Sequence, residues 1–123
     1  CQPTYPLNTI GAGTLSMCGD VLSAATPNTT LAIESMPAFA NGLLFFAVFP
    51  GPVTSPWNSA QLISSGPVVL GPTFGNAAGD FVVPLNIGGV LPPGWALYLQ
   101  SVYTDGSLPG GVGVTNAIKV EWN

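Results

Sequence analysis

Few side chains in this chain of 123 residues can take part in acid–base, metal or phosphate chemistry. Charged residues make up 5% of the sequence, against about 25% in a typical soluble protein. The chain has no His and no Arg, which excludes a Ser-His-Asp or Cys-His pair, an imidazole metal site and a bidentate clamp for phosphate. We therefore expect neither enzyme activity nor a cofactor. The charged side chains are Asp20, Glu34, Asp80, Asp105, Lys119 and Glu121.

The five carboxylates are spread along the chain. No two are close in sequence and no Asp-x-Asn-x-Asp-Gly loop is present, so no calcium site is expected. Asp20, Asp80 and Asp105 each adjoin a glycine, which is typical of turns. A small hydrolase is the remaining enzymatic alternative, and it predicts a cleft in which two distant carboxylates converge.

Lys119 is the single cationic side chain, in a chain of net charge -4 with a pI near 4.1. Nucleic-acid binding depends on clustered Lys and Arg, so nucleic acid is excluded as a partner. Lys119 lies near Asn116, Glu121 and Asn123, which are the residue types of a self-forming isopeptide bond in surface fibres. A solvent-facing lysine on an edge strand is the simpler interpretation.

The two cysteines, Cys1 and Cys18, predict a disulfide in a protein from an oxidising compartment. The chain starts without Met, which indicates an exported product whose signal peptide has been removed. We expect an extracellular or cell-surface location. The alternative is a lipid on Cys1, which would leave Cys18 as a free thiol. Asn28-Thr29-Thr30 is a glycosylation sequon in an expected turn, so Asn28 is a glycosylation candidate, although a Pro-Asn turn alone also explains these residues.

Thirteen prolines and sixteen glycines are distributed along the whole sequence. They separate short apolar segments at a spacing too tight for helices, which predicts an all-β fold. We expect seven to eight short strands in a single β-sandwich of immunoglobulin-like or jelly-roll kind. Pro84 cannot donate to a strand ladder and so predicts an edge strand or a bulge. The expected strands cover residues 31–36, 43–49, 61–64, 68–70, 80–87, 95–103 and 115–122.

The longest apolar run covers residues 43–49, between Gly42 and Pro50. A transmembrane helix needs about 20 such residues, so no membrane span is expected. The run is apolar at both odd and even positions, which predicts a central strand covered on both faces. A short core helix is the alternative.

The sequence from residue 91 onward resembles the C-terminal β-sandwich modules of secreted planctomycete and myxobacterial proteins. Those modules combine a Gly and an aliphatic-Tyr-x-Gln strand with a closing Gly-x-Ser-Asn-Ala strand. A Gly-Cys pair usual in the middle of the module is absent from this chain. The resemblance implies an exported β-sandwich and supplies no activity. The matching residues are Gly94, Leu97, Tyr98, Gln100, Gly113, Asn116, Ala117 and Val120, with Thr115 in place of Ser, and Gly79-Asp80-Phe81 and Val83-Pro84 are also similar.

The charge deficit and the doubly apolar strands predict a structural subunit of an extracellular filament or surface assembly, with copies of itself as partners. We divide the chain into an N-terminal segment, 1–18, and a sandwich domain, 19–123. Residues 7–17 are apolar and broken by glycines, so they are a candidate donor strand for a neighbouring subunit, or else the first strand of their own sandwich. The expected interface residues are Ile10, Leu15, Leu44, Phe46, Val48 and Trp57.

The alternative function is a monomeric secreted module that binds carbohydrate or a cell-surface partner. Aromatic side chains form flat platforms for sugars, and this interpretation makes a glycan the partner. Core packing and subunit contacts explain the same aromatic residues equally well. The candidates for such a platform are Trp57, Trp95, Tyr98 and Tyr103.

Overall fold

The computed structural model describes residues 1–20, 22, 24, 27–57, 60–87 and 90–122. Strands dominate this part of the chain, which confirms the all-β prediction. A single short 3-10 turn, η1, covers Pro109–Gly111. The described residues form eleven strands where seven to eight were expected, and four of the eleven have only two or three residues. The strands are β1 (Thr4–Tyr5), β2 (Thr14–Gly19), β3 (Thr29–Glu34), β4 (Asn41–Ala47), β5 (Val53–Thr54), β6 (Gln61–Leu62), β7 (Val68–Phe74), β8 (Phe81–Leu85), β9 (Ala96–Thr104), β10 (Val112–Val114) and β11 (Ala117–Glu121).

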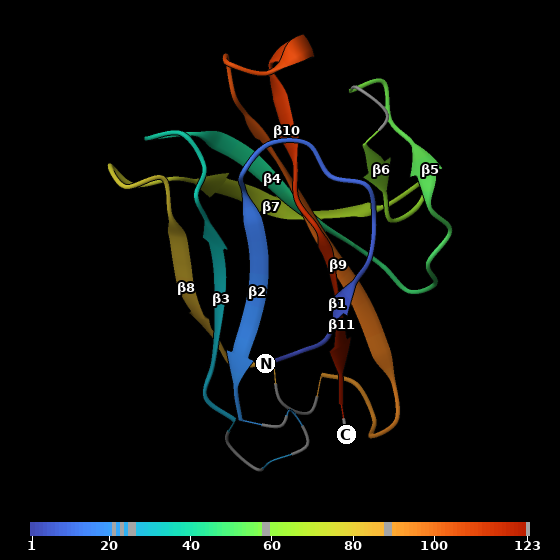
Figure 1. Ribbon diagram of the computed structural model, residues 1–123. Coiled ribbons are helices and arrows are strands. Elements are labelled where there is room, and N and C mark those ends of the chain that lie inside the picture. Colours follow the sequence, from blue (N-terminus) through green and yellow to red (C-terminus); the bar gives the residue numbers. More distant parts are fainter. Residues whose placement is uncertain (21, 23, 25–26, 58–59, 88–89, 123) are drawn as a thin grey trace.

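Two antiparallel sheets form the sandwich (Figure 1). The larger sheet has the order β1-β11-β9-β4-β7, with β10 also paired to β9. The smaller sheet has the order β2-β3-β8. A two-stranded hairpin, β5-β6, stands beside the larger sheet. Strand β7 is therefore an edge of the larger sheet and β8 an edge of the smaller one.

Strand β4 contributes to two separate cores because its neighbouring side chains point to opposite faces. Leu44 and Phe46 pack into the main core between the two sheets. Phe45 and Ala47 pack into a second, smaller core on the outer face of the larger sheet, together with Ile63. The prediction of a strand that is apolar on both faces is confirmed, and the helix alternative is wrong.

The strand predicted over residues 43–49 is displaced at its end. β4 stops at Ala47, and Phe49 is 81% exposed. The sequence Pro50-Gly51-Pro52 explains this early end, because proline cannot continue the ladder and restricts the residue before it. Pro84 lies in the edge strand β8 opposite Thr30, as its missing N–H predicts.

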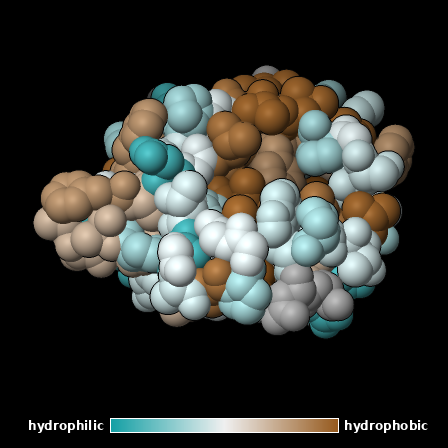
Figure 2. All heavy atoms as spheres, turned by 90° about the horizontal axis from the view of Figure 1, so that it is seen from above, coloured by the Kyte–Doolittle hydropathy of each residue, from teal (hydrophilic) through white to brown (hydrophobic). Residues whose placement is uncertain are grey.

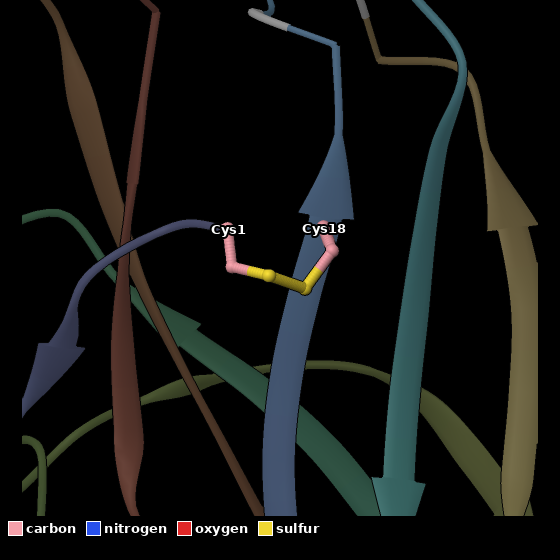
Figure 3. Close-up of a disulfide and its surroundings, with 2 residues drawn as sticks. All are labelled: Cys1 and Cys18. Carbon is pink, nitrogen blue, oxygen red and sulfur yellow. A yellow bond between two sulfur atoms is a disulfide. The ribbon is translucent and has the colours of Figure 1, made fainter.

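Residues 1–18 belong to the same sandwich as the rest of the chain. β1 pairs with β11, and β2 pairs with β3 over its whole length. The disulfide between Cys1 and Cys18 joins the start of the chain to β2 and so links the two sheets (Figure 3). Neither cysteine is free, so the lipid alternative for Cys1 does not describe this structure. Residues 14–19 form a strand of their own sandwich in this chain.

Two side-chain amides, the buried Gln100 and the half-buried Asn116, anchor neighbouring segments to the larger sheet. Gln100 accepts a hydrogen bond from Ile63 N (2.8 Å) and donates to the carbonyls of Gln61 and Thr115 (both 2.9 Å). The amide of Asn116 bonds both backbone groups of Leu15 at 2.9 Å, which joins β2 to the residue before β11.

Tyr103 fastens the N-terminal segment in the same way. Its hydroxyl accepts a hydrogen bond from Gly13 N at 2.8 Å. Gly11, Gly13 and Gly113 surround the ring so closely that a Cβ at any of them would clash with it. Burial raises the pKa of the Tyr103 phenol above its ordinary value, the Gly13 hydrogen bond opposes this, and Asp105 adds to it.

Candidate functional site

Large hydrophobic side chains are exposed on strands that carry no charge. Residues 35–79 and 81–104 contain no Asp, Glu, Lys or Arg, so β4, β7, β8 and β9 are free of charge throughout. Figure 2 shows strongly hydrophobic residues gathered around a hollow rather than scattered singly. Such gathering marks interaction surfaces more often than isolated exposed side chains do. Eleven large hydrophobic residues are exposed in the described part of the chain: Phe39, Leu43, Val48, Phe49, Val68, Val69, Leu70, Phe74, Val82, Val90 and Trp95.

Strand β7 contributes four of these side chains. It is the edge of the larger sheet, and its free side has no hydrogen-bonded strand among the described residues. Natural edge strands are commonly protected by charged side chains, by proline or by bulges. β7 has no charge, but it carries an irregularity at Leu70, because its register with β4 shifts between Leu44 and Phe45 and leaves Leu70 without a partner there. Pro72 protects the second half of the strand, whereas Val68, Val69 and Leu70 precede it.

An apolar cavity of about 310 Å³ opens between the edges β7 and β8. Its floor is the inner face of the larger sheet and its wall is the end of β8. The side chains deepest in it are almost fully buried, while Leu70 and Val90 at its mouth are 53% and 61% exposed. Every described residue that lines it is apolar. The lining residues are Leu44, Leu70, Leu85, Ile87, Val90, Leu97, Leu99, Val120 and Trp122.

The four aromatic residues expected to form a sugar platform divide between two hollows, Trp57 with Tyr103 and Trp95 with Tyr98. Trp57 lines one hollow with Leu43, Val102 and Val112, whereas Trp95 lines another with Phe49, Tyr98 and Lys119. The ring of Tyr98 makes an edge contact with Tyr5 at 5.4 Å between centroids. Tyr103 is among the residues that line the Trp57 hollow, but it is only 2% exposed and packs closely against glycines.

The six residues expected at a subunit interface have different environments. Leu15 and Leu44 are buried in the main core, and Phe46 packs against it. Ile10 is half-buried and forms an isolated bridge with Val114. Val48 is exposed, and Trp57 is half-buried at the rim of its hollow.

Three of the carboxylates bind backbone N–H groups of turns and loops. Asp20 accepts from Asn28 N at 3.0 Å, Asp80 from Ser35 N at 3.2 Å, and Asp105 from Ser107 N at 3.0 Å. These contacts confirm that the Asp residues beside glycines mark turns. Within the described residues, no group of three or more His, Cys, Asp or Glu could hold a metal ion.

A small hollow of about 170 Å³ beside the disulfide is lined by both Asp20 and Glu121. Glu121 forms an ion pair with Lys119 at 3.6 Å, and Asp20 fixes the turn before β3. Asp20 and Glu121, distant in sequence, thus line the same hollow, and each also has a partner in the fold. Asn28, the sequon residue, is exposed.

No protein-family model, curated protein or solved structure matches the chain. The resemblance of residues 91–122 to the planctomycete and myxobacterial modules therefore stays a prediction. Two of the residues that carry it, Gln100 and Asn116, have structural roles in this fold. None of the described helical segments has the length and hydropathy needed to cross a membrane. The disulfide is compatible with an oxidising location outside the cell.

Sequence reasoning missed the exposed aromatic residue Phe39 and the cavity between β7 and β8. Phe39 follows Pro37-Ala38 in a segment that lies between two expected strands, and its backbone has a φ of 57°. A bulky residue in the left-handed region is rare, and the sequence pattern contains no signal for it. The cavity depends on which strands become edges, which the strand pattern alone does not determine.

Proposed function

We propose that this chain is a structural subunit of an extracellular filament or surface assembly, built from copies of itself through apolar contacts. The observation that supports this most is the exposure of Val68, Val69 and Leu70 on an uncharged edge strand. A dispersed monomer would gain from charge at such an edge, because charge prevents pairing between copies. The disulfide supports the extracellular part of the proposal.

The distribution of charge favours contacts between identical chains. Each copy carries a net charge of -4, which opposes association wherever charged surfaces meet. The uncharged strands allow two copies to approach while their carboxylates stay apart. Charges separated by more than about 8 Å are largely screened at physiological ionic strength.

Strand addition between subunits is assigned to the edge of β7 rather than to residues 7–17. Moving residues 7–17 into a neighbour would break the pairing of β2 with β3, the two Asn116 hydrogen bonds and the Tyr103 contact. The first half of β7 needs no such rearrangement. Main-chain hydrogen bonds from Val68–Leu70 would then join the larger sheets of neighbouring copies.

The test is the oligomeric state of a Val69→Lys variant. Val69 is 55% exposed, so a lysine there is compatible with the fold and places a charge on the free edge. We expect wild type to associate with rising concentration and Val69→Lys to remain monomeric. Thr14→Lys adds the same charge at an exposed position of β2 and should associate like wild type. Equal association of all three proteins would contradict the proposal.

A second candidate function is glycan binding at the hollow of about 390 Å³ lined by Trp95, Phe49, Tyr98 and Lys119. The favouring observation is the 54% exposure of Trp95 beside a lysine donor. A glycan array read with wild type and Trp95→Ala tests it. Binding that is lost in the variant, by a protein that stays monomeric, would favour this function over the structural one.

A further inference from the structure

Phe39 lies at the tip of a rigid double turn. The connection between β3 and β4 packs against the connection between β7 and β8, at the upper left of Figure 1. Met36 N bonds Gly79 O at 3.0 Å, and Phe39 N bonds Asn76 O at 3.0 Å. Met36 and Ala40, on either side of the tip, are buried in the main core. The tip is therefore held firmly by the fold.

The side chain at this tip is unusual in two ways. Phe39 is 70% exposed, and its φ of 57° lies in the left-handed region, which glycine adopts at much lower cost. The fold holds a large aromatic ring in solvent at a backbone position where it is strained. Strain that the surrounding structure maintains is typical of functional sites. A rigid exposed aromatic residue has the properties of an interface anchor.

The cavity between β7 and β8 has the chemistry to receive such a ring. Its volume of about 310 Å³ is about twice that of an engineered apolar cavity that holds benzene, about 150 Å³. Phe39 of the same chain does not line it. The double turn precedes the first residue of β8, whereas the cavity is lined by Leu85 and Ile87 at and beyond its last residue. Ring and cavity therefore lie at opposite ends of this strand.

We infer that Phe39 of one copy inserts into the β7–β8 cavity of the next copy, in a head-to-tail contact. This inference rests on the proposed function and names the contact that builds the assembly. A projection and a hole at different places on the same molecule form a heterologous contact, which continues into an open chain when rotation does not close it. The uncharged strands β4, β7, β8 and β9 around the cavity let a second copy of the same net charge approach.

The first variants are Phe39→Gly and Leu70→Glu. Phe39→Gly relieves the left-handed strain, so we expect a higher melting temperature. The same variant removes the ring, so we expect association to weaken at least about 30-fold, as when an interface loses an anchor residue. Leu70→Glu places a charge at the mouth of the cavity. Phe49→Ala is the matched control, because Phe49 is even more exposed but lies outside the double turn, and it should associate like wild type.

The decisive experiment mixes the two variants and measures mass by sedimentation velocity. At a concentration too low for the weakened association of Phe39→Gly, each variant alone should be monomeric. An equal mixture at that concentration should form a one-to-one dimer, because one chain retains the ring and the other retains the cavity. A mixture that stays monomeric would overturn the pairing of ring and cavity. Association of Phe39→Gly equal to that of an associating wild type would overturn this inference and leave the proposed function standing. A wild type that never associates would overturn both.

Discussion

The buried amide of Gln100 makes a quantitative prediction about how the outer face of the larger sheet is covered. The variant Gln100→Leu keeps the volume of the side chain and removes its three hydrogen bonds to Ile63 N, Gln61 O and Thr115 O. One buried N–H, the buried carbonyl of Thr115 and the part-buried carbonyl of Gln61 lose a partner. At about 1 kcal/mol or more for each orphaned group, the free energy of unfolding falls by about 3 kcal/mol. For a domain of this size the melting temperature falls by roughly 12 °C.

The assay is urea unfolding followed by tryptophan fluorescence, at a concentration where the protein is monomeric. Gln61→Leu is the control, because the Gln61 amide accepts one exposed hydrogen bond, from Asn8 N at 3.0 Å. That variant should lose about 0.5–1.5 kcal/mol. Equal losses in the two variants, or a loss below about 1 kcal/mol in Gln100→Leu, would refute the assigned role of the buried amide.

Two further predictions concern the N-terminal segment. Reducing the disulfide between Cys1 and Cys18, which are 17 residues apart, should lower the free energy of unfolding by about 3 kcal/mol. Calorimetry with and without reductant measures this change, and equal melting temperatures would refute it. Burial raises the folded-state pKa of Tyr103 above the pKa of about 10 that its phenol has in the unfolded chain. The contribution of the protonated phenol to stability is therefore complete at a pH below the unfolded-state pKa and is lost as the pH rises through the folded-state pKa. Unfolding titrations between pH 8 and about 11 should show this alkaline loss in wild type and a weaker one in Tyr103→Phe, and equal profiles would contradict it.

The fold class could be predicted because the local signals agree with the final structure. Proline and glycine separate the apolar segments, and the alternation of Ile118, Val120 and Trp122 inward with Lys119 and Glu121 outward matches β11. Pro84 predicted an edge strand for a direct physical reason, the absence of its N–H. The two-residue strands β1 and β5 were missed because pairs this short have no detectable periodicity, whereas β6 lies within the strand expected over residues 61–64.

The surface could be predicted only in part. The charge deficit indicated that apolar side chains would be exposed, but Leu15 and Leu44 proved to be core residues while Val69 and Phe39 are exposed. Which apolar residues reach the surface depends on strand order, and a strand's own sequence does not show whether it becomes an edge. The role of Gln100 was hidden for a similar reason, because its partners are 15 to 39 residues away.

Self-association of the native, oxidised chain is the central claim, and sedimentation velocity over a wide concentration range tests it most directly. Negative-stain electron microscopy of the same samples would show the form of any assembly. We predict mass that grows with concentration, uniform filaments, and association that persists as salt is raised, because the contact surface carries no charge. A single monomeric species at every concentration and salt level would contradict the account.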